Sequence, residues 1–185
     1  MFKTLFNPDR HTNRAIVDAL YDRIVAAARQ QRFYAEWGVP DTPLGRFEML
    51  TLHVFLFLER ARGTGKVLGG IAQELTDEFF KDVEHSLREL GIGDMGVPKR
   101  MKKLAKMFYG RAEAYRDAVE RGDRAALIAA LARNVRPEEA GWLGAAPLAA
   151  YSLAATAELA GQDEERLAAG ELAFPAADSI GVSEP

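Results

Sequence analysis

Apolar residues recur at intervals of three and four along almost the whole chain, which is the spacing of one face of an α-helix. In the first such segment, about residues 12–32, the apolar stripe is formed by Ile16, Leu20, Ile24 and Ala27. No segment alternates between apolar and polar residues, as a half-buried β-strand does. The pattern therefore predicts an all-α protein.

Local signals at the ends of the apolar segments divide the chain into helices. Thr12, Thr42 and Asp123 stand where N-cap residues are expected, and Pro43 follows Thr42 at the favoured first helical position. After the segment at 12–32, further helices are predicted over about residues 43–62, 71–90, 98–121, 124–134 and 147–159. With one or two more turns near the C-terminus, we expect a bundle of about six to seven helices.

Length and composition fit one globular domain. The chain has 185 residues, of which 48% are hydrophobic and 28% are charged. A chain of this size usually builds one core. We expect an N-terminal extension over residues 1–11, a helical domain over residues 12–160, and an acidic, partly disordered C-terminal segment over residues 161–185. The absence of cysteine excludes disulfides, thiolate catalysis and cysteine-ligated metal centres.

Two apolar stretches fall short of a membrane span. The stretch at 49–58 has ten residues, whereas a spanning helix needs about 20. The stretch at 141–157 consists mostly of alanine and glycine and is interrupted by Pro147, and such small residues contribute little to membrane insertion. The N-terminus does not have the pattern of a signal peptide. We therefore expect a cytoplasmic protein.

The GTGK segment at residues 63–66 matches only part of a phosphate-binding loop. The full motif needs a glycine five residues before the second glycine and a serine or threonine after the lysine. Arg60 and Val67 occupy these two positions. The segment therefore does not predict nucleotide binding.

A few polar residues on predicted helices have the character of site residues. Glu78, Asp82 and His85 share one helix face, and they form at most half of a carboxylate–histidine metal site, which needs a second set of ligands. A solvated acidic face explains them more simply. His53 lies in the most apolar segment, where a hydrogen-bonded core histidine is the usual finding. We predict no catalytic residue, no metal and no cofactor, and hence no enzyme.

Positive charge is concentrated between residues 98 and 111, although the net charge of the whole chain is −3. Met101, Leu104 and Phe108 form an apolar stripe there, so the helix is amphipathic with a cationic outer face. Acidic residues between 74 and 84 could neutralise this face, or it could bind an anionic partner such as RNA, lipid headgroups or an acidic protein surface. The candidate residues for binding an anionic partner are Lys99, Arg100, Lys102, Lys103, Lys106 and Arg111.

Three long segments carry a family resemblance: VPDTPLGRFEMLTLHVFLFLERARG, AQELTDEFFKDVEHSLRELGIGDMGVPKRMKKLAKMFYGR and LIAALARNV. They are similar to the ubiquinol–cytochrome c chaperone family, whose members assist the assembly of respiratory complex III. The resemblance covers about residues 12–140. It implies a helical, non-enzymatic chaperone that binds newly made cytochrome b.

The resemblance also implies further partners. Mitochondrial members of the family associate with the ribosome, so the ribosome or an anionic membrane surface is a candidate partner, whereas DNA is not expected. Without a recognisable transit peptide, the chain resembles a bacterial-type member, either cytoplasmic or peripheral at the inner face of the cytoplasmic membrane. The alternative function is a ribosome- or RNA-binding module that acts through residues 98–111.

The aromatic segments FYAEW and MFYGR and the motif GRFEML are the candidates for contact with the client. Tryptophan and tyrosine are favoured over phenylalanine because their polar tips suit an interface. The arginine of GRFEML either pairs with an acid inside the domain or contacts a partner. The candidate client-binding residues are Trp37, Arg46, Phe47 and Tyr109.

Overall fold

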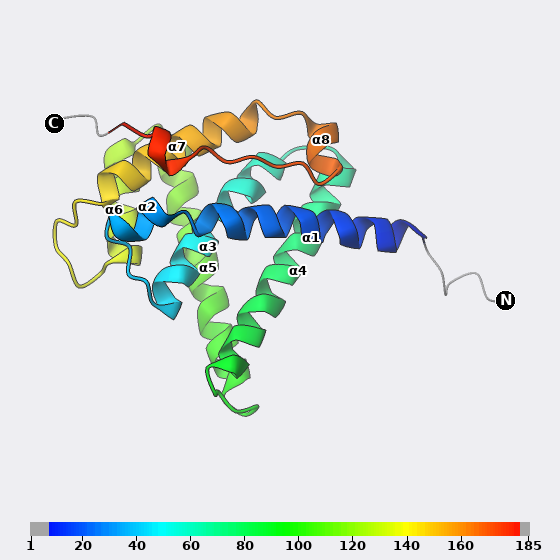
Figure 1. Cartoon of the computed structure of the whole chain (residues 1–185), viewed down its shortest axis with the longest axis horizontal. Helices are drawn as coiled ribbons and strands as arrows, with labels where there is room; N and C mark the ends of the chain where they lie inside the picture. The colour runs from blue at the N-terminus through cyan, green and yellow to red at the C-terminus, as the bar shows by residue number, and fades with distance from the viewer. Residues whose placement is uncertain (1–7, 182–185) are drawn as a thin grey trace.

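Helices account for the regular secondary structure in the part of the chain that the structure describes. The computed structural model describes residues 8–181, with side chains described from residue 13 onward. Between residues 8 and 181 there is no β-strand, so the all-α prediction is confirmed. In chain order the elements are α1 (Pro8–Ala28), α2 (Gln31–Ala35), α3 (Pro43–Ala61), α4 (Lys66–Glu89), α5 (Val97–Glu120), α6 (Arg124–Val135), α7 (Ala145–Ala160), α8 (Glu164–Ala168) and the 3₁₀ helix η1 (Ala177–Ser179) (Figure 1).

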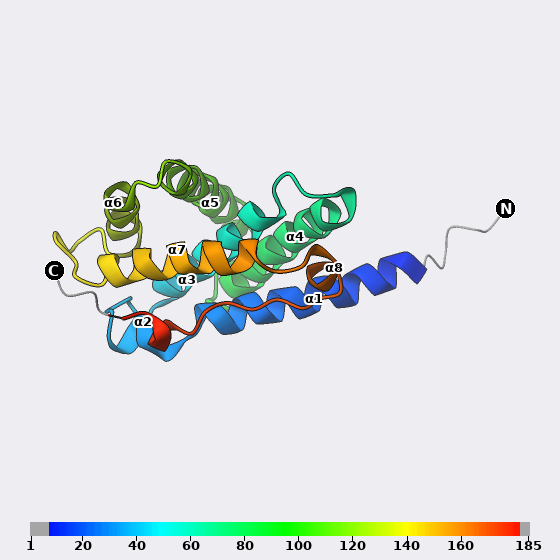
Figure 2. The ribbon, with the colours of Figure 1, turned by 90° about the horizontal axis from the view of Figure 1, so that it is seen from above.

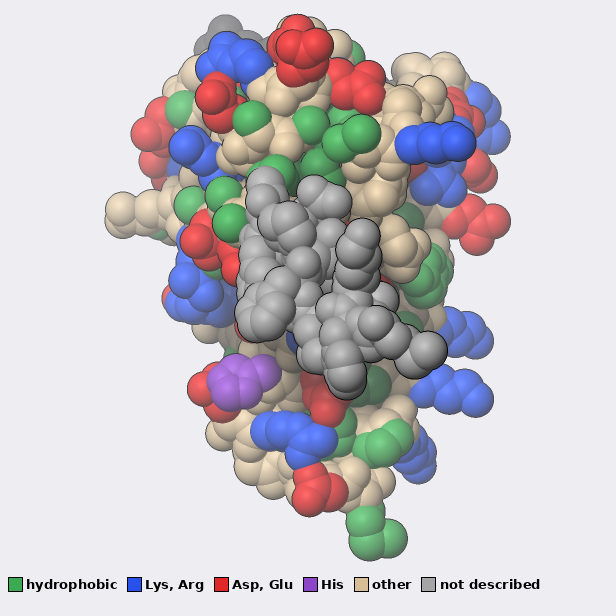
Figure 3. All heavy atoms as spheres, turned by 90° about the vertical axis from the view of Figure 1, so that its right-hand side faces the viewer, with side chains coloured by type: hydrophobic (Ala, Val, Ile, Leu, Met, Phe, Trp, Pro, Cys, Tyr) green, Lys and Arg blue, Asp and Glu red, His purple; other side chains and the backbone are tan. Residues whose placement is uncertain are grey.

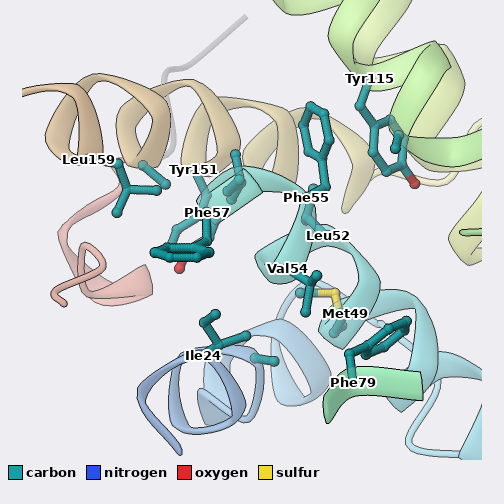
Figure 4. Close-up of a cluster of buried hydrophobic side chains, with 14 of the residues drawn as sticks. Ile24, Met49, Leu52, Val54, Phe55, Phe57, Phe79, Tyr115, Tyr151 and Leu159 are labelled. Carbon is teal, nitrogen blue, oxygen red and sulfur yellow. The ribbon is translucent and has the colours of Figure 1, made fainter. Parts of the chain in front are cut away.

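Helix α3 lies at the centre of the bundle. Helices α1, α4, α5, α6 and α7 all pack against it, because its apolar side chains point in every direction around its axis. In Figure 4, Phe55 points toward Tyr115 of α5, and Phe57 points toward α7. The rings of Phe55 and Tyr115 meet edge to face with their centroids 5.6 Å apart. The core is therefore built outward from α3.

The remaining helices form layers around α3. Seen from above, α1 and the C-terminal segment lie on one side, α3, α4 and α7 lie in the middle, and α5 and α6 lie on the opposite side (Figure 2). Helices α4 and α5 run antiparallel and project beyond the rest of the bundle (Figure 1). The loop that joins them, residues 90–96, forms the end of this projection.

Two predicted helix caps are confirmed. The hydroxyl oxygen of Thr42 accepts a hydrogen bond from the backbone N–H of Gly45 at 3.2 Å. A carboxylate oxygen of Asp123 accepts one from the N–H of Ala126 at 2.9 Å. Each cap satisfies a backbone donor that has no partner within its helix, and so fixes where α3 and α6 begin.

Two predicted helix starts are wrong. Helix α1 begins at Pro8 rather than after Thr12, so residues 8–11 are helical, and the rest of the predicted N-terminal extension lies outside the described residues. Helix α4 begins at Lys66, although two glycines follow within its first turns. Burial of Leu68 in the core extends the helix, because tertiary packing overrides the weak helix propensity of glycine.

The segment after α7, predicted to be partly disordered, follows a defined path alongside α1 (Figures 1 and 2). Leu167 and Leu172 are buried in the core. The side-chain carbonyl of Gln30 accepts a hydrogen bond from the N–H of Ala177 at 2.6 Å. These contacts make the segment part of the bundle, and only residues 182–185 lie outside the described residues.

His53 is a hydrogen-bonded core histidine, as expected, and both of its ring nitrogens have partners. Its Nδ1 lies 2.8 Å from the carbonyl of Met49, and because a carbonyl only accepts, Nδ1 carries the proton. Nε2 then accepts a hydrogen bond from the hydroxyl of Tyr151 at 2.9 Å, and Gln30 donates to the same hydroxyl oxygen at 3.3 Å. Burial lowers the pKa of His53 to about 4. A neutral imidazole therefore links α3 to α7.

We expect this histidine to make the protein sensitive to acid. Its contribution to stability is complete above its unfolded-state pKa of about 6.5 and is lost as the pH falls toward its folded-state pKa, a loss of about 3 kcal/mol. The free energy of unfolding in urea, measured at pH 7 and pH 4, should fall by about that much more in the wild type than in His53→Gln. Parallel pH profiles for the two proteins would contradict this prediction.

Candidate functional site

A groove of about 550 Å³ opens between α1, the first turns of α3 and the second half of α4. This volume is typical of ligand-binding pockets, which are mostly apolar with a few polar groups at the edge. The large apolar side chains that line it are Val25 from α1, Leu44, Phe47 and Leu50 from α3, Val83 and Leu87 from α4, Leu90 from the loop after α4, and Leu104 from α5.

The groove owes its shape to the way the chain enters α3. A Cβ atom at Gly45 would lie 1.9 Å from the carbonyl oxygen of Pro40, so only glycine allows the entering segment to cross so close to the first helical turn. This tight entry leaves Leu44 more than half exposed at the edge of the groove. Phe47, one turn further on, is buried and stacks on Phe79 with ring centroids 6.1 Å apart. The groove therefore has a firm apolar base and an open edge that carries charged side chains beside Leu44.

Arg46 lies at the edge of the groove and pairs within the chain. Its Nε lies 2.6 Å from a carboxylate oxygen of Asp41, and both side chains are more than half exposed. The hydrogen bond from Arg46 lowers the pKa of Asp41. The sequence left open whether Arg46 pairs inside the domain or contacts a partner. The structure shows the internal pair, and the guanidinium still lines the groove.

The polar residues considered as half of a metal site have other contacts. Asp82 accepts a hydrogen bond from the hydroxyl of Tyr21 at 2.8 Å, and burial raises the pKa of Tyr21. Nε2 of His85 lies 3.2 Å from a carboxylate oxygen of Glu89, and Glu78 pairs with an arginine of α1 at 3.0 Å. Among the side chains that the structure describes, no three acidic or histidine residues are grouped to hold a metal ion.

The basic residues of α5 divide into two groups. Five of them are exposed, and within the described part of the chain no carboxylate lies within 4.0 Å of their charged groups. The acidic stretch at 74–84 therefore does not neutralise them through ion pairs. We call these five residues the cationic face: Lys99, Arg100, Lys102, Lys103 and Lys106.

Arg111 belongs to the core rather than to the cationic face, which corrects the sequence-based assignment. Its guanidinium forms a two-pronged ion pair with Glu48 of α3. The side chains are only 12% and 1% exposed, respectively. Burial raises the pKa of Glu48, and the guanidinium acts against this shift. Arg111 therefore compensates a buried charge and is not available to an external anion.

Two of the three aromatic candidates for client contact, Trp37 and Tyr109, lie away from the groove. Trp37 is only 5% exposed, and its carbonyl accepts a hydrogen bond from the indole N–H of Trp142 at 2.8 Å, so the expectation of an interface residue does not fit its burial. Tyr109 is exposed on α5, beside Phe80. Of the four candidate client-binding residues, the fold brings only Arg46 and Phe47 together at the groove.

Sequence reasoning missed most of the apolar lining of the groove. Leu44, Leu50, Leu87 and Leu90 fit helical patterns, which normally indicate core residues. One signal was available for Leu44: it follows the Thr-Pro start of α3, and the first turn of a helix is often at an edge of the fold. The pattern alone does not indicate which apolar residues lack a covering helix.

Comparison with known proteins agrees with this architecture. The family model described as "Ubiquinol-cytochrome C chaperone" matches residues 35–174. The chain belongs to this family. This membership of the ubiquinol–cytochrome c chaperone family confirms the resemblance seen in the sequence. The match extends past residue 140 into the segment packed along α1. The matched region includes all of α3, α4 and α5.

Two individual proteins are similar to this family member. The crystal structure of the Cbp3 homolog from Brucella abortus is 55% identical, with a TM-score of 0.89, and the match covers 98% of this chain and 100% of that chain. "Ubiquinol-cytochrome-c reductase complex assembly factor 1" from Xenopus laevis is 26% identical over 116 residues. That match covers 63% of this chain and spans 58% of the length of the Xenopus protein. Among the described helices of this chaperone-family protein, none is long and apolar enough to cross a membrane.

We expect loss of the buried ion pair to destabilise the protein strongly. Arg111→Met leaves the Glu48 carboxylate buried without its partner, which should lower the free energy of unfolding at neutral pH by about 3–5 kcal/mol. Arg46→Met, the matched control, removes an exposed pair and should leave stability almost unchanged. Urea unfolding of both variants measures the difference. Equal stability of the two variants would contradict the structural role of Arg111.

The defect of Arg111→Met should also depend on pH. Without the guanidinium, the pKa of Glu48 rises further in the folded state, above its value in the unfolded chain. A group with a raised folded-state pKa favours folding at low pH, and this contribution is lost as the pH rises through that pKa. The difference in unfolding free energy between the wild type and Arg111→Met should therefore be smaller at pH 5 than at pH 8. A difference that does not change with pH would show that lost packing, not the buried charge, causes the defect.

Proposed function

We propose that this chain is a non-enzymatic assembly chaperone that binds newly made cytochrome b and supports the biogenesis of respiratory complex III. Membership of the ubiquinol–cytochrome c chaperone family supports this proposal, as does the likeness to a protein named as an assembly factor of the ubiquinol–cytochrome c reductase complex. The structural observation that carries it is the apolar groove, because a chaperone for a membrane protein needs apolar surface that its own fold leaves uncovered.

The groove suits one side of an apolar helix better than a small polar ligand. Apolar side chains from four helices line it, and Leu44 and Leu90 each expose more than half of their surface. A helix placed there would insert side chains spaced three and four residues apart. Covering apolar surface stabilises the complex by roughly 25 cal/mol per Å², so the contact protects the client without any chemical step.

Because the groove covers only one side of a client helix, the client can also be released. The groove covers one side of a helix, so the other sides remain free to pack against neighbouring helices of the assembling protein. The edge carries the exposed pair of Arg46 and Asp41, and exposed ion pairs contribute little to affinity. Binding of moderate strength then gives way to the larger interfaces of the assembled complex. We place this exchange in the cytoplasm, at the inner face of the cytoplasmic membrane, where newly made membrane helices enter the bilayer.

Photo-crosslinking in cells tests the client contact directly. A crosslinking amino acid at Leu44 or Leu90 should capture cytochrome b, because both side chains lie on the groove. The matched control is Leu143, which is also exposed but lies just before α7, away from the groove. Absence of cytochrome b from the adducts at both groove positions, with folded and expressed protein, would contradict the proposal.

A complementation experiment tests the consequence for assembly. In cells that lack this gene, the wild type and Leu143→Asp should restore complex III, whereas the double variant Leu44→Asp and Leu90→Asp should not. Each new carboxylate would lose its hydration when a client covers it, which weakens binding of the client. The readouts are the amount of assembled complex III and the level of cytochrome b transcript. Normal assembly with the groove variant would show that the groove does not hold the client.

A further inference from the structure

We propose that the end of the α4–α5 hairpin docks on the surface of an anionic lipid bilayer. We call this region the hairpin tip, and it consists of the loop at 90–96, the cationic face of α5 and the neighbouring Tyr109. Two features of the tip support the proposal: exposed apolar side chains, and positive charges that have no ion-pair partner among the residues that the structure describes.

The first feature is the exposed apolar surface of the hairpin tip. The described part of the chain has six large hydrophobic side chains that are strongly exposed, and three of them are in this region. Met95 is 98% exposed at the end of the loop, and Leu90 and Tyr109 are 58% and 59% exposed. Water solvates such side chains poorly, whereas methionine and leucine side chains enter the acyl boundary of a bilayer, and tyrosine is common at the headgroup level.

The second feature is the excess of positive charge. Residues 84–106 contain six lysine or arginine residues and three acids, which gives +3, whereas the whole chain carries −3. All three acids have partners: Glu84 and Asp94 pair with Arg88, and Glu89 pairs with His85. Figure 3 shows lysine and arginine side chains one above another along one edge of the lower half of the molecule, where the hairpin projects. The positive charge on α5 is therefore left for an external anion.

The helical spacing places the lysines and Tyr109 on one side of α5. Lys99, Lys102, Lys103 and Lys106 fall within an arc of about 100° around α5 and within about 10 Å along its axis. Tyr109 follows Lys106 by three residues and continues this face. Lysine stems are long enough to keep their ammonium groups at the phosphate level while the apolar tip enters the membrane. The arrangement is that of a cationic helix face with an adjacent apolar loop, since the apolar stripe of α5 itself packs in the core.

A bilayer explains both features, whereas RNA explains only one. RNA would bind the lysines through its phosphates, but the exposed side chains of Met95 and Leu90 would gain nothing from it. The part of the chain outside residues 84–106 carries −6, so an anionic membrane repels it and attracts the tip, which orients the molecule with the tip toward the lipid. Docking requires no client, and among the groove residues only Leu90 belongs to the tip.

Vesicle flotation with the purified full-length chain tests the proposal. The chain should bind vesicles of phosphatidylcholine that contain about one-third phosphatidylglycerol, and it should not bind pure phosphatidylcholine vesicles. Binding should weaken at high salt, because the attraction is screened. Failure to bind the anionic vesicles at low salt would overturn the proposal. Because no cytochrome b is present, this result is separate from the outcome of the crosslinking experiment.

Charge reversal identifies the surface that binds. The triple variant Lys102→Glu, Lys103→Glu and Lys106→Glu should lower the partition onto anionic vesicles by on the order of 100-fold, since each lost attraction counts for roughly fivefold. The matched control is the triple variant Lys66→Glu, Arg124→Glu and Arg133→Glu, which changes the net charge by the same amount at exposed residues outside the tip. This control should bind anionic vesicles far more tightly than the tip variant. Equal losses in the two triple variants would overturn the proposal, because they would show a general charge effect.

Substitution of an apolar residue of the hairpin tip distinguishes binding to lipid from binding to RNA. Met95→Ser should lower vesicle binding about fivefold, and Leu143→Ser, at an exposed position outside the tip, should not. Circular dichroism during heating checks that each variant is folded. If the wild type bound single-stranded poly(U) RNA in a salt-sensitive way but did not bind vesicles, and the lysine variant lost RNA binding, the cationic face would be an RNA site and the lipid proposal would be wrong.

Discussion

Helix α3 is stable only if every side of it is covered, since its apolar side chains surround its axis. Every residue from Thr51 to Phe57 is buried, and five other helices pack against α3 to achieve this. The polar groups of α3 impose a second condition, because a buried polar group needs a partner. Glu48 meets it through Arg111 of α5, and His53 meets it through Tyr151 of α7, whereas the buried hydroxyl of Thr51 has no hydrogen-bond partner among the described residues. These contacts determine which helices lie beside α3 and in what register.

The groove and the hairpin tip follow from a difference in helix length. Helices α4 and α5 have 24 residues each, whereas α3 has 19, so at 1.5 Å per residue the hairpin is about 7 Å longer than the helix it covers. The surplus length projects beyond the core and carries Met95 and the lysines into solvent. At the start of α3, the enclosing helices leave Leu44 and Leu50 only partly covered. The groove and the hairpin tip therefore lie where the helices packed against α3 no longer match it in length.

Features that depend on a few neighbouring residues could be predicted from the sequence. The all-α class, the caps at Thr42 and Asp123 and the amphipathic helix at 98–121 all rest on local spacing or local hydrogen bonds. Contacts between distant segments could not be predicted. Trp37 is buried, and its carbonyl accepts a hydrogen bond from the indole N–H of Trp142, 105 residues further along the chain. Nothing in the segment FYAEW indicates that partner, so an aromatic residue between two helices looked like part of an interface.

Helical spacing separates Arg111 from the lysines of α5, but it does not separate Arg111 from Arg100. Arg111 lies seven residues after Leu104 and three after Phe108, which places it near the apolar stripe and away from the lysines. A charged residue on the buried side of a helix requires a buried partner of opposite sign, and Glu48 occupies a corresponding position within the apolar segment of α3. Spacing alone does not exclude Arg111, because Arg100 lies eleven residues earlier, on nearly the same side of α5, and is exposed. The difference between these two arginines, and the choice of Glu48 as the partner 63 residues away, required the three-dimensional structure.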